Sequence, residues 1–166
     1  EGLSGNDLLE GEGGDDRISG GNGADTIFAR QGDDSVEGNA GQDLVFLGNG
    51  DDRFDDSPEA NSAGSDTVFG GAGDDTLISL AGGDELHGED GNDELTGGSG
   101  ADRLFGGINF DTIAAGAGND TAWGGDGRDL IFLGLGNDVF NDNGQGGELG
   151  RDTVFAGAGD DRIEGG

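Results

Sequence analysis

The chain lacks several residue types on which many folded proteins depend. Its 166 residues include no Cys, no Met, no Tyr, one Trp and one Pro. Without Cys, a fold held together by disulfide bonds is excluded. No apolar run approaches the roughly 18 residues that a membrane-spanning helix needs. The sequence therefore excludes disulfide scaffolds and predicts no membrane insertion by this segment.

Positive charge is also scarce. Seven basic residues, all of them Arg, stand against 37 acidic residues, which gives a formal net charge of −30. This charge repels nucleic acid and anionic membranes, so we expect neither as a partner. Only 30% of the residues are hydrophobic, and such a composition is typical of disordered chains. Folding therefore requires a cation that the sequence does not supply.

Glycine and aspartate are abundant, and they recur at a fixed spacing. With Asp at the sixth place of a nine-residue frame, the chain divides into 17 repeats that begin with GLSGNDLLE at 2–10 and GEGGDDRIS at 11–19. Five-residue insertions at 56–60 and 142–146 interrupt the frame. Nothing is left over for a second domain, so we expect one repeat domain over residues 1–166.

Within each repeat, position eight is always apolar, and position four is Gly in every repeat except the one with Asn109. Positions seven to nine predict a three-residue strand in which only position eight faces the core. The other six residues predict a turn, because Gly adopts positive φ without steric penalty. Such short strands become stable only when successive coils stack about 4.8 Å apart.

The repeats GGNGADTIF, GGAGDDTLI and GGSGADRLF resemble the calcium-binding nonapeptide of RTX proteins. This resemblance covers residues 2–166. It implies an all-β fold, a right-handed parallel β-roll (β-solenoid) whose 18-residue coils each contain two nonapeptides. It also implies a secreted, extracellular or cell-surface location after type I secretion. We further expect the chain to be a fragment of a larger secreted protein with flanking domains.

The position-six carboxylates are the candidate calcium ligands, because Ca²⁺ prefers six to eight oxygen atoms. Two repeats per coil place alternate Asp residues along two edges, which allows up to about 15 sites between turns. An alternative is that Asp only forms turns, but this does not explain Asp at every sixth position. The position-six residues, together called the Asp ladder, are Asp7, Asp16, Asp25, Asp34, Asp43, Asp52, Asp66, Asp75, Asp84, Asp93, Asp102, Asp111, Asp120, Asp129, Asp138, Asp152 and Asp161.

Catalytic chemistry finds no support in the sequence. The only His, His87, occupies an outward position nine, and the Gly-rich turns lack the Lys of a phosphate-binding loop. We therefore expect no enzyme activity and no catalytic residues.

Position nine of alternate repeats is aromatic. Stacked coils are expected to align Phe28, Phe46, Phe69, His87, Phe105 and Trp123 into one outer row, here called the aromatic row. The rings either only support one another or form an interaction face for a partner, another domain or another copy.

Two functions fit these features. The first is a calcium-binding module that folds on Ca²⁺ binding outside the cell and supports type I secretion and folding of a larger protein. The second is a structural or adhesive repeat block of a bacterial surface layer, filament or large adhesin, with self-association between copies. Both depend on calcium.

Overall fold

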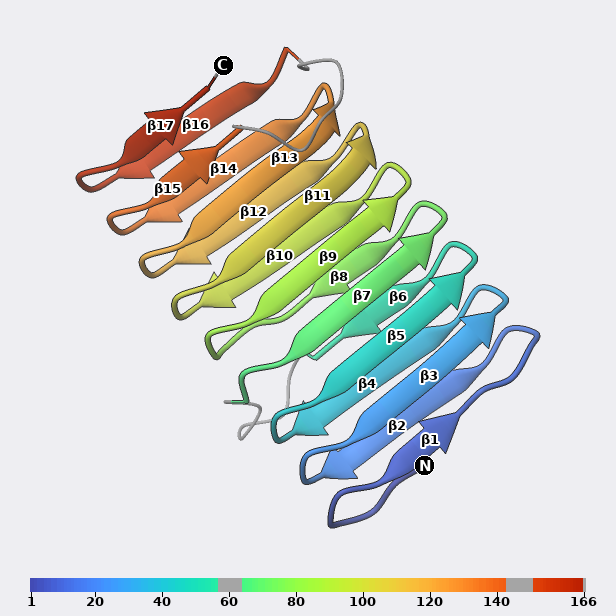
Figure 1. Cartoon of the computed structure of the whole chain (residues 1–166). Coiled ribbons are helices and arrows are strands. Elements are labelled where there is room, and N and C mark those ends of the chain that lie inside the picture. Colours follow the sequence, from blue (N-terminus) through green and yellow to red (C-terminus); the bar gives the residue numbers. More distant parts are fainter. Residues whose placement is uncertain (57–63, 143–150, 166) are drawn as a thin grey trace.

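The computed structural model describes residues 1–56, 64–142 and 151–165. These residues form strands and turns only, so none belongs to a helix that could cross a membrane. Of the predicted insertions at 56–60 and 142–146, only Asp56 and Asp142 belong to the described residues. Figure 1 shows an elongated stack of coils with the two termini at opposite ends.

The strands belong alternately to two parallel sheets. The nine-stranded sheet contains β1 (Leu8–Glu10), β3 (Thr26–Gln31), β5 (Leu44–Asn49), β7 (Thr67–Ala72), β9 (Glu85–Asp90), β11 (Arg103–Asn109), β13 (Thr121–Gly127), β15 (Val139–Asn141) and β17 (Arg162–Glu164). The eight-stranded sheet contains β2 (Arg17–Asn22), β4 (Ser35–Ala40), β6 (Arg53–Asp55), β8 (Thr76–Ile78), β10 (Glu94–Ser99), β12 (Thr112–Ala117), β14 (Leu130–Leu135) and β16 (Thr153–Ala158).

The pairing register confirms two nonapeptides per coil. Ile27 pairs with Val45, which holds the same position two repeats later, and Val45 pairs with Val68 across the first insertion. The inserted residues therefore leave the register of the stack unchanged. Every interstrand pair is parallel, as the predicted β-roll requires.

The prediction of three-residue strands is wrong for most repeats. Twelve strands have six or seven residues, because the extended backbone continues through positions one to three of the next repeat. Their burial pattern shows a second inward position, position one, which holds the fully buried Ala29, Leu47, Ala115 and Leu133. The strand therefore contributes two side chains to the interior, in keeping with its alternation.

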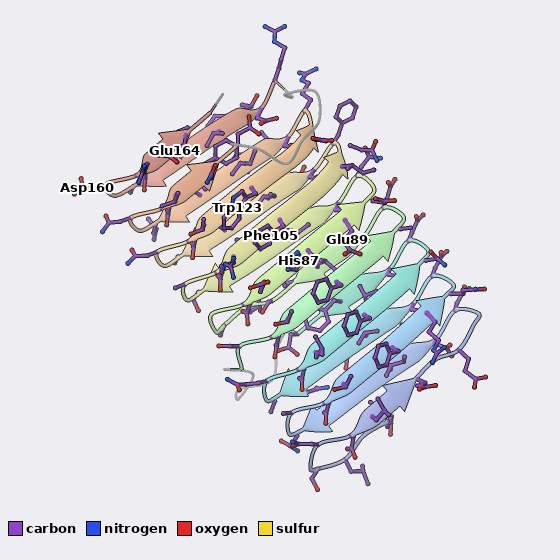
Figure 2. All side chains as sticks on the ribbon, viewed as in Figure 1. His87, Glu89, Phe105, Trp123, Asp160 and Glu164 are labelled. Atoms are coloured by element: carbon purple, nitrogen blue, oxygen red, sulfur yellow. The ribbon has the colours of Figure 1, made fainter. Side chains whose placement is uncertain are left out.

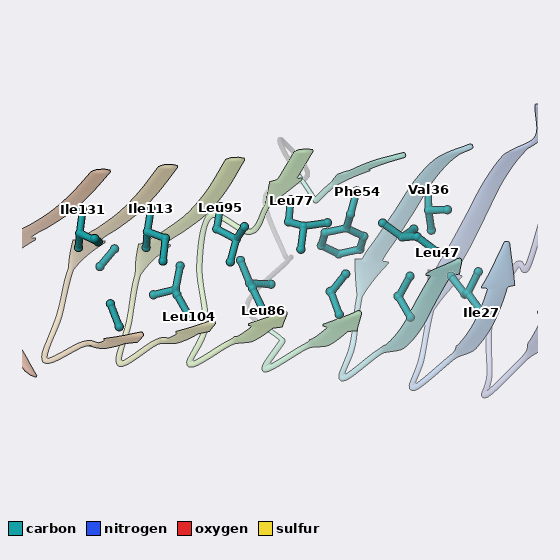
Figure 3. Packing of buried hydrophobic residues seen from close by; sticks show 14 of the residues in the cluster. Ile27, Val36, Leu47, Phe54, Leu77, Leu86, Leu95, Leu104, Ile113 and Ile131 are labelled. Carbon is teal, nitrogen blue, oxygen red and sulfur yellow. The ribbon is translucent and has the colours of Figure 1, made fainter. Parts of the chain in front are cut away.

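The core is a narrow layer between the two sheets (Figure 3). Position-eight side chains such as Ile27, Val36, Leu77, Leu86 and Leu104 are fully buried there. The buried cluster extends from Ile18 to Phe140, and Leu9, Val154 and Ala156 pack against it partly buried, whereas Ile163 of the last repeat is 49% exposed. Because this layer is thin, most of the acidic side chains of the chain lie in the turns or on the outer faces.

Candidate metal centre

The Asp ladder lies where each turn enters its strand, and consecutive members along one edge are linked by hydrogen bonds. Except in Asp152 and Asp161, which end the two rows, the backbone N–H of each Asp donates to Oδ1 of the Asp one coil later, over 2.7 to 3.0 Å. These bonds join the whole ladder into two rows, one along each edge of the stack. The structure therefore brings the predicted ligands together as two ladders.

Burial divides the ladder into an interior and two ends. Thirteen members are at most 3% exposed, whereas Asp7, Asp16, Asp152 and Asp161 are only half-buried. A buried carboxylate needs a hydrogen bond or a counter-ion for every charged oxygen. Oδ1 has the N–H partner described above, whereas Oδ2 needs a separate hydrogen bond or counter-ion.

Twelve ladder residues have a buried Oδ2 without any hydrogen-bond partner among the residues that the structure describes. Leaving a charged buried oxygen unsatisfied costs more than the roughly 1–3 kcal/mol of a neutral group. The twelve are Asp16, Asp25, Asp34, Asp43, Asp52, Asp75, Asp93, Asp102, Asp111, Asp120, Asp129 and Asp138. Their repeated orphaned oxygens are the feature of this fold that most needs a cation.

A backbone carbonyl lies close to this oxygen in several repeats. A Cβ atom added to Gly20 would lie 2.7 Å from both Oδ2 of Asp25 and the carbonyl oxygen of Gly38. The equivalent Cβ on Gly97 would lie 2.6 Å from Oδ2 of Asp102 and 2.7 Å from the carbonyl oxygen of Ala115. Glycine at position one thus leaves a space bounded by oxygen atoms, which are the ligands that Ca²⁺ prefers.

These position-one spaces differ along the ladder. In one repeat Ser79 fills the space, and its hydroxyl donates to Oδ2 of Asp84 over 2.5 Å. Ala29, Leu47, Ala115 and Leu133 carry side chains at the same position. The oxygen environments of the ladder carboxylates are therefore not all equivalent.

The residue at position four of a repeat lies against the backbone carbonyl group of the position-four residue in the preceding coil. Gly100 has a φ of +141°, and an added Cβ would overlap the carbonyl oxygen of Gly82 in the preceding coil. Asn109, the one exception to Gly, adopts the left-handed region with a φ of +82°, as its amino-acid type favours. The Gly requirement at this position is therefore steric as well as conformational.

No group of three or more Asp, Glu, His or Cys side chains converges on one point within residues 1–56, 64–142 and 151–165. A calcium site in this ladder consequently has to combine few carboxylates with backbone carbonyl oxygens. Such a donor set consists of oxygen alone, which fits Ca²⁺ and disfavours softer metals.

Burial also raises the pKa values of the interior carboxylic acids. The pKa of Asp43 rises to about 6, that of Asp75 to about 7 and that of Asp66 to about 8. Loss of hydration is the largest cause, the N–H bond from the preceding coil opposes it, and neighbouring carboxylates raise the pKa further. Without a cation, the ladder therefore favours protonation.

Asp56 is a buried acidic residue that the sequence interpretation missed, because it was assigned to an insertion. It follows position nine of its repeat directly, and this order could have identified it as position one. Its Oδ1 accepts the N–H of Asn39 at 2.6 Å, and burial, ahead of repulsion from Asp43, raises its pKa to about 7. Asp142 begins the second insertion in the same way, and its pKa is also raised by burial and by Asp152.

The aromatic row lies on the outer face of the nine-stranded sheet, where Figure 2 shows His87, Phe105 and Trp123 on adjacent strands. Its six rings, Phe28, Phe46, Phe69, His87, Phe105 and Trp123, stack nearly parallel with centroids 4.3 to 5.0 Å apart. His87 is held between two Phe rings, and its Nε2 lies 2.9 Å from Oε1 of Glu85. These contacts account for His87 as a structural residue.

The comparison with protein families agrees with this geometry. The model of the RTX calcium-binding nonapeptide repeat, in four copies, matches residues 1–36, 19–54, 62–86, 78–113, 105–140 and 142–166. No curated protein sequence matches the chain. The family is calcium-binding, and the buried Asp ladder fits that property. The chain therefore belongs to the family of RTX calcium-binding nonapeptide repeat proteins.

Proposed function

We propose that this chain is a calcium-responsive folding module of a secreted protein. The observation that carries the proposal is the set of twelve buried Oδ2 atoms that have no hydrogen-bond partner in the described part of the chain. A fold with so many uncompensated buried carboxylates is unfavourable alone and becomes favourable when divalent cations neutralise them.

In this proposal the Asp ladder supplies the carboxylate ligands along both edges. Apart from Asp7 and Asp16, which begin the two rows, each ladder Asp keeps the N–H bond from the preceding coil on Oδ1, so Oδ2 is the oxygen offered to the ion. Backbone carbonyls from the Gly-rich turns complete the donor set. Bound calcium supplies positive charge between neighbouring turns, and the chain's own residues set the spacing of those turns.

Calcium binding and folding are then one coupled process, because the site does not exist in the unfolded chain. In a calcium-poor cytoplasm the net charge of −30 favours an unfolded chain that could pass through a type I secretion channel. Calcium outside the cell would fold the module and support folding of the larger protein.

Circular dichroism with and without calcium tests the proposal. We expect a coil spectrum in excess chelator and a cooperative gain of β signal as Ca²⁺ is added. Mg²⁺ is expected to be a poor substitute, because it retains its waters and demands tighter geometry. A full β spectrum in excess chelator above pH 8, where the ladder carboxylates are charged, would contradict the proposal. Calcium-dependent self-association, measured by sedimentation, would instead favour the structural or adhesive repeat block.

A further inference from the structure

Asp84 differs from its neighbours in the Asp ladder, because side-chain and backbone donors of the chain reach both of its carboxylate oxygens. Asp84 is 1% exposed, and its Oδ1 accepts the backbone N–H of Asp66 at 2.8 Å, as elsewhere in the interior of the ladder. Its Oδ2 accepts the hydroxyl of Ser79 at 2.5 Å, a distance typical of a hydroxyl bound to a charged carboxylate. This buried carboxylate is therefore satisfied by hydrogen bonds within the chain.

Repeats with Gly at position one have a different arrangement. At Gly97, one coil after Ser79 on the same edge, the space at position one is open and is bounded by Oδ2 of Asp102. At Gly88 on the other edge, an added Cβ would lie 2.3 Å from Oδ2 of Asp93. In both repeats Oδ2 is buried and has no hydrogen-bond partner among the residues that the structure describes. An open space and an uncompensated carboxylate oxygen thus occur together.

Repeats with an apolar residue at position one separate these two features. Ala115 and Leu133 occupy this position with fully buried side chains that carry no hydrogen-bond donor. Oδ2 of Asp120 and Oδ2 of Asp138, in the same two repeats, remain buried and unpartnered within residues 1–56, 64–142 and 151–165. A side chain at position one is therefore not sufficient to satisfy the carboxylate. Ser79 satisfies it because its side chain ends in a hydroxyl.

The backbone holds Ser79 in the place from which its side chain reaches Asp84. Strand β8 ends at Ile78, and the N–H of the following Ser79 donates to the carbonyl oxygen of Thr96 at 2.9 Å. Ser79 itself is 1% exposed, so water does not compete for its hydroxyl. The contact with Asp84 is thus fixed by the sheet on one side and by burial on the other.

From this comparison we infer that Ser79 takes the place of a calcium ion at Asp84, so that the row of calcium ligands along this edge is interrupted between Asp66 and Asp102. Two donors directed at one carboxylate stabilise its charged form without an ion. A cation at Oδ2 would have to displace the hydroxyl, which would then be buried without its partner. The inference rests on the proposed function, because it concerns which ladder carboxylates serve as ligands.

Crystals grown in saturating calcium test the inference directly, because calcium ions can be located by their anomalous scattering. We expect anomalous peaks within coordination distance, about 2.3–2.6 Å, of Oδ2 of Asp93 and of Asp102. We expect no such peak within this distance of Oδ2 of Asp84. A peak at Asp84 as strong as the one at Asp102 would overturn the inference, since Asp84 would then be a calcium ligand despite Ser79.

Exchanging the residues at position one tests the same point in solution. Ser79→Gly gives this repeat the open space of its neighbours and should raise the calcium bound per folded chain by one ion. Gly97→Ser is the reciprocal variant and should lower it by one ion. Gly13→Ser is the matched control, because a Cβ at Gly13 would have its nearest neighbour 3.8 Å away, at Gln31, and would not approach the ladder. It should leave the bound calcium unchanged.

Bound calcium is measured by equilibrium dialysis followed by elemental analysis, and folding of each variant by circular dichroism in calcium. Unchanged or reduced binding in folded Ser79→Gly would overturn the inference, and this variant decides the question even where Gly97→Ser does not fold. Failure of the proposed function has a different signature, since the unsubstituted chain would then bind no calcium at all. An ion at Asp84 in a chain that folds with calcium contradicts the role of Ser79 alone.

Discussion

Replacing Asp93 by Asn removes the negative charge of an interior ladder residue while nearly preserving its shape. Asp93 is 2% exposed, its Oδ1 accepts the N–H of Asp75 at 2.8 Å, and its Oδ2 has no hydrogen-bond partner within residues 1–56, 64–142 and 151–165. Asn keeps one oxygen for the N–H of Asp75 but places an NH₂ group at the other site. The variant therefore tests the charge offered to calcium separately from the hydrogen bond that links the coils.

The size of the effect depends on how many ions bind in one step. Loss of one partner of a buried charge pair costs about 3–5 kcal/mol. If about 15 ions bind together with folding, a loss of about 4 kcal/mol is shared among them and raises the calcium midpoint roughly 1.6-fold. If only about two ions respond, the same loss raises the midpoint roughly 30-fold. The measured ratio thus reports the cooperativity of the stack.

Asp7→Asn is the control, because Asp7 is half-buried in the first coil and its Oδ2 accepts the N–H of Leu3 at 3.3 Å. It has one ladder neighbour along its edge, Asp25, whereas Asp93 lies between Asp75 and Asp111. Both variants are titrated with calcium and followed by circular dichroism. We expect a smaller midpoint shift for Asp7→Asn. Equal midpoints for the two variants would refute sharing of interior carboxylates between turns.

Two further predictions concern protons and backbone space. Burial raises the pKa values of the folded ladder, up to about 8 for Asp66 against an ordinary 3.8, so between these pH values the calcium-free folded state binds more protons than the unfolded state. The stability of the calcium-free fold therefore falls as pH rises, and a chelated sample should gain β signal when its pH is lowered from about 8 to about 5. A β signal that grows with rising pH would contradict this sign. Gly100→Ala should lower the thermal midpoint in saturating calcium by an amount equivalent to about 1–3 kcal/mol, because the new Cβ overlaps the carbonyl oxygen of Gly82 at positive φ. Gly13→Ala, whose Cβ would have its nearest neighbour 3.8 Å away, should melt as the unsubstituted protein does, and equal losses for both would refute the steric argument.

The nine-residue period by itself determined the fold class and the positions of the candidate ligands. Asp at every sixth place and an apolar residue at every eighth place can be satisfied together only if successive coils stack in register, as the pairing of Ile27 with Val45 confirms. The aromatic row followed from the same period, since Phe28 and Phe46 hold the same position in successive coils. Local alternation and a strict repeat were sufficient for these inferences.

Only the tertiary structure decided how far each strand extends and what lies beside each carboxylate. Asp56 lies in the interior directly after β6 ends at Asp55, and its N–H donates to the carbonyl oxygen of Ile78 over 2.9 Å, although the sequence frame had assigned it to an insertion. A hollow beside Trp123 likewise depends on tertiary structure, because Gly107 of β11 and Gly125 of β13 pair side by side and leave its floor without side chains. The reason is physical: the repeat fixes which residues are equivalent, whereas burial, carbonyl orientation and empty space arise only when neighbouring coils are in contact.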